Sequence, residues 1–461
     1  MMGSSKTLIN LLRGWPNPAL LPVSRIRPAA EAALSDPSVS TPGLLYGPDP
    51  GYEPLREQVA QWLTSFYDTR EPILAERICI TGGASQNLAC LLQVFTDPIY
   101  TRNVWMVAPT YFLACRIFED SGFHGKLRAV PEDEQGINLE ILKDGLEKSE
   151  EKAQLQGNVK PTLKPPRPWS KIYRHIIYAV PTFSNPSSTT MSLNRRQELV
   201  RLARRYDALI VTDDVYDCLQ WSTSPGNGQA PLRKAVEPRI VDVDRYLDGG
   251  AERPGSDGFG NAVSNGSFSK IVGPGFRTGW AEGTEKMAHG VSQTGSSRSG
   301  GAPSQLSATF VAELLKSGDL NTHIETSLLP AYASRYRKMS AAIEKHLSPL
   351  GVRSAQPGRE VVGGYFIWLE LPDYLSADNV AARAKDVENL IVAQGSLFEV
   401  YGDEAAATFP RSIRVCFSWE NEDRLTESIE RLARVIEDMQ SNGDDDQKQQ
   451  ASSDPLGEVY R

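Results

Sequence analysis

The chain has 461 residues, of which 40% are hydrophobic and 23% charged, a composition typical of a soluble globular protein with a large core. Its 49 Lys and Arg residues against 57 Asp and Glu give a net charge of -8, so no basic surface favours nucleic acid. No apolar stretch is long enough to span a bilayer, and the first residues lack the pattern of a secretory signal. Five scattered cysteines and five isolated histidines argue against disulfides and metal sites and indicate a reducing compartment, the cytoplasm by default.

The chain begins with a proline-stiffened arm. Residues Leu11–Pro18 read Leu-Leu-Arg-Gly-Trp-Pro-Asn-Pro, and the prolines favour extended backbone over helix. A helix is predicted to begin near Pro54, a residue tolerated in a first turn. The apolar positions of this helix recur at helical spacing, at Leu55, Val59 and Leu63.

A strand, a glycine turn and a helix follow one another over residues 77–95. The strand at Arg77–Thr81 is β-rich, and Gly82 and Gly83 turn the chain out of it. The helix that follows is predicted to bury one face, formed by Leu88, Leu91, Leu92 and Phe95. Free N–H groups and the helix dipole converge at such a helix start, so the pattern predicts an anion site, although many strand–helix turns carry glycine for other reasons.

Three more apolar runs are predicted as strands, and each is followed by a polar or aromatic residue. Tyr111 follows Val104–Ala108, Asn185 follows Tyr173–Val180, and Asp213 follows Ala208–Val211. Helices alternate with these runs, which favours a parallel sheet with its ligands at the carboxyl ends of the strands. Core packing of the tyrosine and helix capping by the aspartate remain open alternatives on the residues alone.

Lys270 is a cation amid apolar, glycine and serine residues in the segment Gly266–Trp280, which reads Gly-Ser-Phe-Ser-Lys-Ile-Val-Gly-Pro-Gly-Phe-Arg-Thr-Gly-Trp. Where water is scarce, the pKa of a lysine falls and its neutral amine becomes a nucleophile suited to Schiff-base chemistry. The hydroxyls of Ser267 and Ser269 and the guanidinium of Arg277 are suited to a phosphate. A buried strand edge whose lysine reaches out to water is the alternative interpretation.

The last third of the chain predicts a second, smaller domain. A long helical stretch over Asp319–Leu347 would link it to the first part, Gly363–Leu371 is predicted as a strand, and Ser376–Gln394 as an amphipathic helix ended by Gly395. The segment 221–265 is rich in Gly, Pro, Ser and charged residues and is interpreted as an exposed insertion. From residue 441 on, the chain is polar and acidic, which predicts a disordered tail.

These motifs resemble those of class I/II aminotransferases, the fold-type I enzymes that use pyridoxal 5'-phosphate (PLP). Ser-Phe-Ser-Lys followed by Pro-Gly-Phe-Arg-Thr-Gly-Trp is similar to the family's cofactor–lysine segment, and seven segments over roughly residues 11–439 occur in family order. The resemblance implies an α/β fold with a mostly parallel sheet flanked by helices and a smaller α/β domain. It implies an N-terminal arm over residues 1–40, a large cofactor domain over 41–318, a small domain over 319–440 and a tail over 441–461.

The resemblance also assigns residues to the cofactor. Lys270 would hold PLP covalently and act as general base and acid, and Asp213 would keep the ring nitrogen protonated. Positions that match the family's other cofactor contacts are Gly83, Ala84, Ser85, Ser267, Ser269 and Arg277 at the phosphate, Tyr46 at the phosphate of the neighbouring subunit, Tyr111 stacked on the ring, and Asn185 and Tyr216 at the ring oxygen. Two departures are Ala84, where many relatives have serine, and the Ser187–Ser188 turn after Asn185-Pro186, where the family has Thr-Gly.

The substrates implied are an amino acid and a 2-oxo acid, whose carboxylate would meet Gly14 and Arg414, and the protein would be a cytoplasmic homodimer. The same cofactor contacts serve PLP-dependent lyases and cyclopropane-carboxylate-synthase-like enzymes, so elimination remains an alternative reaction. A transcriptional regulator on this fold is a third reading, disfavoured because no DNA-binding domain precedes Gly14. An acidic substrate side chain would need a further cation, for which Arg13 and Arg298 are candidates, whereas an aromatic or aliphatic one would meet Trp15.

Overall fold

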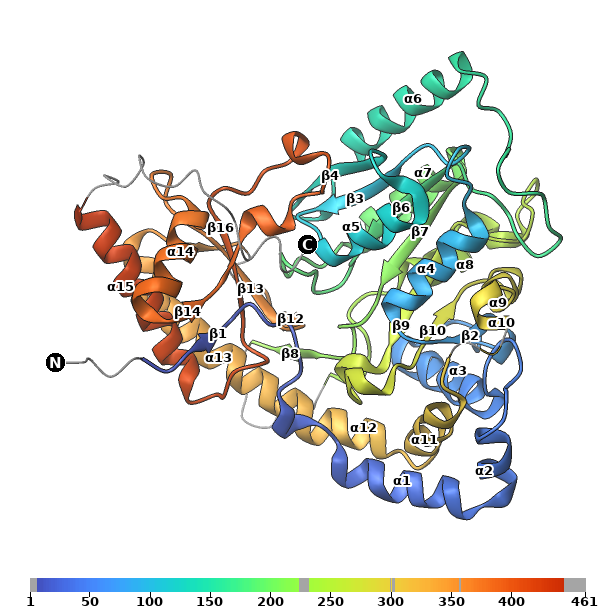
Figure 1. Ribbon diagram of the computed structural model, residues 1–461, viewed down its shortest axis with the longest axis horizontal. Coiled ribbons are helices and arrows are strands. Elements are labelled where there is room, and N and C mark those ends of the chain that lie inside the picture. The colour runs from blue at the N-terminus through green and yellow to red at the C-terminus, as the bar shows by residue number, and fades with distance from the viewer. Residues whose placement is uncertain (1–5, 224–231, 299, 301–302, 356–357, 443–461) are drawn as a thin grey trace.

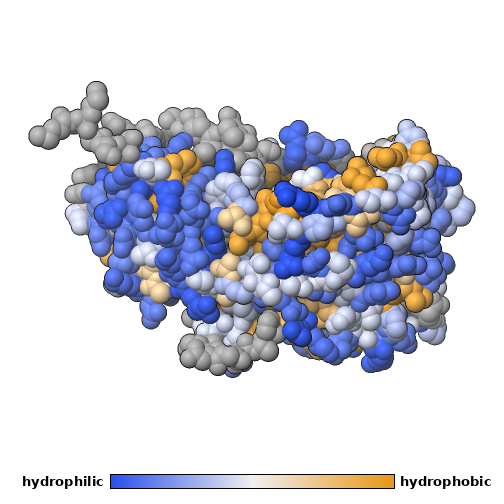
Figure 2. Space-filling model, turned by 90° about the horizontal axis from the view of Figure 1, so that it is seen from below, coloured by the Kyte–Doolittle hydropathy of each residue, from blue (hydrophilic) through white to orange (hydrophobic). Residues whose placement is uncertain are grey.

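The computed structural model describes residues 6–223, 232–298, 300, 303–355 and 358–442. A large sheet flanked by helices lies beside a smaller sheet with its own helices, and the long helix α13 (Leu329–His346) runs along both (Figure 1). Figure 2 shows the side on which α1 and α2 lie, mostly hydrophilic with separate apolar patches. No helix in the described part of the chain is both long and apolar enough to cross a bilayer.

The large sheet has eight strands in the order β2-β10-β9-β7-β6-β3-β4-β5. Strands β9, β7, β6, β3 and β4 pair in parallel, whereas β10 runs antiparallel to both neighbours. The predicted mostly parallel sheet is thus confirmed, and its central strands are buried along their whole length. The strands are β2 (Ile78–Thr81), β3 (Val104–Ala108), β4 (Leu127–Asp133), β5 (Gly136–Ile137), β6 (His175–Ala179), β7 (Ala208–Asp213), β9 (Ala262–Ser267) and β10 (Gly279–Glu282).

The helices around this sheet follow from apolar periodicity and local caps. The predicted apolar face of α4 is buried, and α7 begins after Ser192, whose Oγ accepts a hydrogen bond from the Arg195 backbone N–H at 3.3 Å. These helices are α1 (Val23–Ser35), α2 (Pro37–Gly43), α3 (Glu53–Tyr67), α4 (Ala84–Phe95), α5 (Phe112–Phe118), α6 (Leu139–Leu155), α7 (Leu193–Arg205), α8 (Ile240–Tyr246), α9 (Glu285–Ser292), α10 (Gly295–Arg298), α11 (Gln305–Lys316) and α12 (Asp319–His323).

The smaller sheet is antiparallel and has the order β11-β13-β16-β15. The N-terminal strand β1 pairs in parallel with β14, so the start of the chain lies against this second unit. Strand β12 pairs with β8, which follows β7 in the chain, and so joins the two parts. The elements are β1 (Ile9–Asn10), β8 (Gln220–Ser222), β11 (Arg353–Ser354), β12 (Val361–Gly363), β13 (Phe366–Glu370), β14 (Leu390–Ile391), β15 (Ala393–Gln394), β16 (Ser412–Cys416), α14 (Ala377–Glu388) and α15 (Arg424–Asn442).

Three sequence predictions need correction. The segment 221–265 is not simply an exposed insertion, because α8 and the part of β9 within it are buried, and Asp242 and Asp244 of α8 pair with arginines. Residues 224–231 of this segment lie outside the described part. The helix expected to reach Gln394 ends at Glu388, since Asn389 adopts a left-handed conformation (φ 49°) and turns the chain into β14. Helix α15 runs to Asn442, past the expected start of the tail at residue 441, and residues 443–461 lie outside the described part.

A buried arginine ties α8 to the sheet. The Arg239 guanidinium, 1% exposed, pairs with Asp242 at 2.9 Å and with Glu282 of β10 at 2.7 Å. It also lies over the Tyr67 ring at 4.2 Å. The surrounding carboxylates hold the pKa of Arg239 well above its usual range despite burial. Loss of this cation would leave the buried Asp242 without its charge partner in a low-dielectric environment, while Glu282, among the described residues, would keep only Arg77, at 3.1 Å.

We expect Arg239→Met to lower the free energy of unfolding by about 3–5 kcal/mol, because breaking a buried pair leaves uncompensated charge. Arg201→Met is the matched control, since Arg201 pairs with Asp248 at a site where both side chains are at least half exposed; it should cost no more than about 1 kcal/mol. Urea denaturation of both variants, followed by circular dichroism, measures the difference. Equal losses in the two variants would contradict the role given to the buried pair.

Candidate active site

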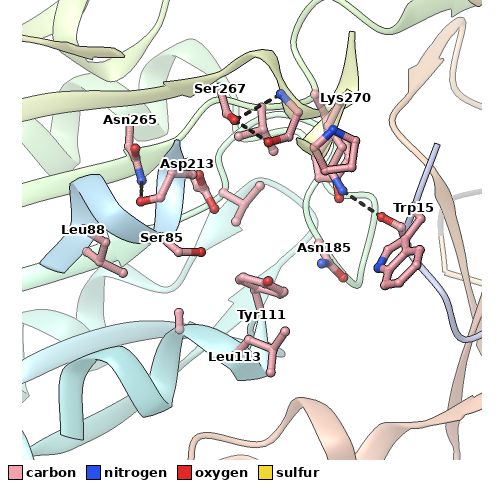
Figure 3. A pocket seen from close by; sticks show the side chains of 18 of the residues that line it. Trp15, Ser85, Leu88, Tyr111, Leu113, Asn185, Asp213, Asn265, Ser267 and Lys270 are labelled. Carbon is pink, nitrogen blue, oxygen red and sulfur yellow. Dashed lines mark hydrogen bonds between the residues drawn. The ribbon is translucent and has the colours of Figure 1, made fainter. Parts of the chain in front are cut away.

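A cavity of about 620 Å³ lies at the carboxyl ends of the central strands of the large sheet. Its walls come from the N-terminal arm, the start of α4, helix α5, the ends of β7 and β9, and Arg414 of β16. In Figure 3, Asp213, Asn265 and Ser85 lie at one end, Lys270 and Trp15 at the other, and Tyr111 faces the space between them. The fold therefore collects residues that are far apart in the sequence.

Lys270 follows β9 in a short 3-10 turn and points its amine into the cavity. Its Nζ donates a hydrogen bond to the Gly14 carbonyl oxygen at 2.7 Å (Figure 3) and lies 5.5 Å and 5.2 Å from the ring centres of Tyr216 and Tyr365. Burial lowers the pKa of Lys270 to about 8, only partly opposed by the charge of Asp213. A sizeable share of its amine is therefore neutral near neutral pH.

Asp213 ends β7 at the opposite end of the cavity. Its Oδ2 accepts a hydrogen bond from the Tyr178 hydroxyl at 3.0 Å, and its buried Oδ1 has no partner within the described residues. Burial raises the pKa of Asp213 to about 7, while the Tyr178 hydroxyl favours the ionised form. Asp214 does not line the cavity and instead accepts hydrogen bonds from Thr212 and Ser264.

Donors for an anion converge beside the start of α4. Gly83 is the residue before the helix, and no side chain caps the first N–H groups of the helix. The Arg277 guanidinium donates to the carbonyl of Gly82 at 2.8 Å. A Cβ on Gly83, which has φ 95°, would lie 2.8 Å from Arg277 Nη2, so this approach requires glycine. Ser267 and Ser269 line the same region and are hydrogen-bonded to each other at 2.9 Å.

Arg414 reaches the cavity from β16 in the smaller sheet. Its Nη1 donates to Asn185 Oδ1 at 2.7 Å and its Nη2 to the Leu12 carbonyl, while its buried Nε has no partner within the described residues. The guanidinium lies over the Phe366 ring at 4.1 Å. Burial lowers the pKa of Arg414 to about 10, which leaves it charged at neutral pH. A Cβ on Gly14 would lie 2.7 Å from Phe366 and crowd this approach.

Two further tyrosines face the cavity, and one predicted tyrosine does not. Burial raises the pKa of Tyr111 to about 12 and that of Tyr216 well above its usual value, so both remain neutral phenols. Tyr46 is 88% exposed and does not line the cavity of its own chain. Arg298 also lies outside it and pairs with Asp49 at 3.5 Å, whereas Arg13 and Trp15 line its wall.

Sequence reasoning missed two residues of this site. Tyr178 donates to Asp213 from the neighbouring strand β6, and its position as a hydroxyl in an apolar run was the available signal. Asn265 lines the cavity, bonds the Ala84 carbonyl at 3.0 Å and accepts from Asn87 at 2.8 Å. Asn265 fell at the end of the assumed insertion, where its place in β9 was not recognised.

The residues present suit pyridoxal phosphate. The unpartnered Asp213 Oδ1 can accept from a protonated ring nitrogen, and the uncapped start of α4 with Arg277 can hold a phosphate. Lys270 supplies an amine of lowered pKa for an aldehyde. Within the described residues, no group of His, Cys, Asp and Glu side chains is arranged to hold a metal ion.

Comparisons with known proteins agree with this chemistry. Residues 16–432 match the family model of aminotransferase class I and II. The chain is 36% identical to an uncharacterized protein of Saccharomyces cerevisiae, covering 86% of this chain and 89% of the relative. It is 27% identical to aromatic-amino-acid aminotransferase 1 of Thermococcus litoralis, covering 94% of this chain and 88% of the relative.

A solved structure extends the likeness to the fold. The kynurenine aminotransferase of Pyrococcus horikoshii, crystallised in complex with PMP, is similar with a TM-score of 0.73 and 28% identity, over 94% of this chain and 91% of that one. PMP is the amine form of the PLP cofactor. The match to the family model spans both the large sheet and most of the smaller unit. The chain therefore belongs to the class I and II aminotransferases and is a fold-type I enzyme that depends on pyridoxal phosphate.

Proposed function

We propose that this enzyme moves an amino group between an amino acid and a 2-oxo acid, with Lys270 and Asp213 as its catalytic residues. The observation that carries this assignment is the buried Lys270 amine, which enters the same cavity as the unpartnered Asp213 oxygen. The relatives from Thermococcus litoralis and Pyrococcus horikoshii are named as aminotransferases, which supports transamination over elimination. When bound, pyridoxal phosphate supplies an electron sink for negative charge at the substrate α-carbon.

Lys270 has two tasks in this proposal. Its neutral Nζ would bind the cofactor aldehyde covalently. Once an incoming amino group has freed it, the Lys270 amine would take the substrate α-proton and return it to the carbon on the other side of the nitrogen, a 1,3-proton shift. A pKa near 8 suits both tasks, because the amine can be free to accept a proton and charged to return it. The Gly14 carbonyl, which accepts its hydrogen bond, would hold the amine near the reacting carbon.

The remaining cofactor contacts divide between the two ends of the cavity. Asp213 would accept from the ring nitrogen, held in place by Tyr178, and Tyr111 would lie against the ring. Asn185 and Tyr216 are assigned to the ring oxygen. The proposed phosphate contacts are Gly83, Ala84, Ser85, Ser267, Ser269 and Arg277, of which only Gly83 is not among the cavity-lining residues. The position of Gly83 directly before α4 supports including it in this set.

Arg414 and Gly14 would receive the substrate carboxylate. A guanidinium presents two parallel N–H groups to a carboxylate, and Arg414 keeps its charge at neutral pH. In the described protein the only hydrogen-bond acceptors of Arg414 are the neutral oxygens of Asn185 and Leu12, so its charge has no carboxylate counterpart. A bound carboxylate would supply one.

We also propose a cytoplasmic homodimer whose Tyr46 reaches the cofactor phosphate of the other subunit. The exposure of Tyr46, together with exposed Leu44 and Leu45 beside it, supports a surface covered by a second copy. The absence of disulfides among the five cysteines supports a reducing compartment. The division into domains at residues 41 and 319 stays a prediction. Five π-helical residues, Ile324–Leu328, separate α12 from α13 close to the second boundary.

We expect purified wild-type protein to carry a lysine-linked chromophore that absorbs in the near-visible, and Lys270→Ala to lack it. Among the described residues Lys270 is the only lysine that lines the cavity. Absorption spectra test this, with Lys316→Ala as control, because Lys316 is exposed and pairs with Glu313. Borohydride reduction and peptide mapping that place the cofactor on another lysine would refute the assignment.

Asp213→Asn should retain cofactor but lose turnover by about a hundredfold or more, because an amide does not stabilise a pyridinium proton as a carboxylate does. Asp214→Asn is the matched control, since Asp214 is its buried neighbour outside the cavity. Single-turnover rates with one amino donor, recorded on variants of equal cofactor content, measure the difference. Full activity in Asp213→Asn with loss in Asp214→Asn would reverse the assignment.

The dimer proposal predicts the mass of two chains in sedimentation equilibrium. Tyr46→Phe should keep that mass but release cofactor more readily, by roughly tenfold in dissociation constant, because one phosphate hydrogen bond is lost. Tyr401→Phe is the control, as another tyrosine on the surface outside the cavity. A monomeric wild-type protein with full activity would rule out the shared site.

A further inference from the structure

Among the residues that the structure describes, five charged side chains line the cavity, and one of them has no role in the proposed reaction. The proposal above assigns Asp213 to the ring, Lys270 to the reacting carbon, Arg277 to the phosphate and Arg414 to the substrate carboxylate. Arg13 is the fifth. Its side chain belongs to the arm and is only half-buried, so it meets the cavity from the wall where Trp15 also lies.

The backbone on either side of Arg13 is held by the site itself. The Leu12 carbonyl accepts a hydrogen bond from Arg414, and the Gly14 carbonyl accepts one from Lys270. The Arg13 backbone N–H donates to Asn10 Oδ1 at 3.1 Å. The backbone of Arg13 is therefore held on both sides, through Leu12 by Arg414 and through Gly14 by Lys270. This fixes the position of its Cα at the substrate end of the cavity.

The Arg13 guanidinium is held by aromatic faces rather than by a carboxylate. Its Cζ lies 5.2 Å from the ring centre of Trp15 and 5.2 Å from that of Trp419, and the two rings meet edge to face at 5.6 Å. No carboxylate oxygen of the described residues forms an ion pair with it, in contrast to Arg298, which has Asp49. Contacts to ring faces leave the N–H groups at the guanidinium edge free for a planar anion.

The rest of this wall gives no competing charge recognition. Phe112, Leu113 and Ile117 also line the cavity and are apolar. Among the described residues Asp213 is the only carboxylate that lines the cavity, and it lies at the end away from Trp15. A positively charged substrate side chain would therefore be repelled by Arg13, with no carboxylate nearby to offset the repulsion. A negatively charged side chain would instead pair with Arg13, which has no other carboxylate partner.

We propose that Arg13 is a specificity-determining residue that pairs with the side-chain carboxylate of a dicarboxylic amino donor, such as glutamate or 2-aminoadipate. The proposal rests on the aminotransferase function given above and on Arg414 holding the other carboxylate. Trp15 and Trp419 position the guanidinium for this contact. Neutral donors with large side chains would use the apolar walls and would not depend on Arg13.

Kinetics with a matched donor pair test this inference. Glutamate and glutamine differ by the side-chain charge, so the ratio of their kcat/KM values isolates the contribution of a cation. Arg13→Gln should lower kcat/KM for glutamate and for 2-aminoadipate by roughly a hundredfold and leave glutamine within a few-fold. Arg13→Lys should recover part of the loss, because the charge returns without the guanidinium fork. Arg298→Gln, outside the cavity, should keep the wild-type ratio.

Ligand binding gives a second readout that needs no turnover. Calorimetric titration of the holoenzyme with glutarate and with its monoamide, glutaramate, should show a preference for glutarate that Arg13→Gln abolishes. An unchanged ratio of donors in Arg13→Gln, or a larger loss for phenylalanine than for glutamate, would overturn the inference. Failure of the wild-type enzyme to transfer an amino group from any donor would instead refute the proposed function, while the calorimetric preference would still report on Arg13.

Discussion

Two backbone carbonyls of the N-terminal arm hold the geometry of the site together. The carbonyl of Gly14 accepts a hydrogen bond from Lys270 of the large unit, and that of Leu12 accepts one from Arg414 of the smaller unit. The arm thereby connects both units across the cavity. Because the bonds use backbone oxygens, the Leu12 side chain is left to pack in the core of the smaller unit, whereas a Cβ at Gly14 would lie 2.7 Å from Phe366.

Burial of charge without a matching counter-charge is the second constraint. Desolvation lowers the pKa of Lys270 to about 8 and raises that of Asp213 to about 7, so both groups can change protonation state near neutral pH. Outside the cavity, by contrast, the buried Arg239 guanidinium is paired with the carboxylates of Asp242 and Glu282, which hold its pKa well above the usual range. The same low-dielectric interior therefore contains groups in the cavity that can change protonation state and, elsewhere, ion pairs that stay charged.

The contrast between Arg414 and Arg13 shows how one cavity can treat two carboxylates differently. Arg414 is buried, fixed by Asn185 and Leu12, and suited to a group that every amino acid carries. Arg13 is half-buried and rests on tryptophan faces. In our proposal, substrate binding and substrate selection would therefore use two arginines that are held with different rigidity.

The sequence by itself determined the parallel sheet, the lysine segment and the family, because apolar periodicity and fixed spacing are local properties of the chain. It did not reveal Tyr178 beside Asp213, since that contact depends on the pairing of β6 with β7. Nor did it separate Arg13, which precedes Gly14, from Arg298, which lies in a glycine- and serine-rich segment. Only the tertiary structure placed one in the cavity wall and the other against Asp49, because long-range packing decides which charges find partners.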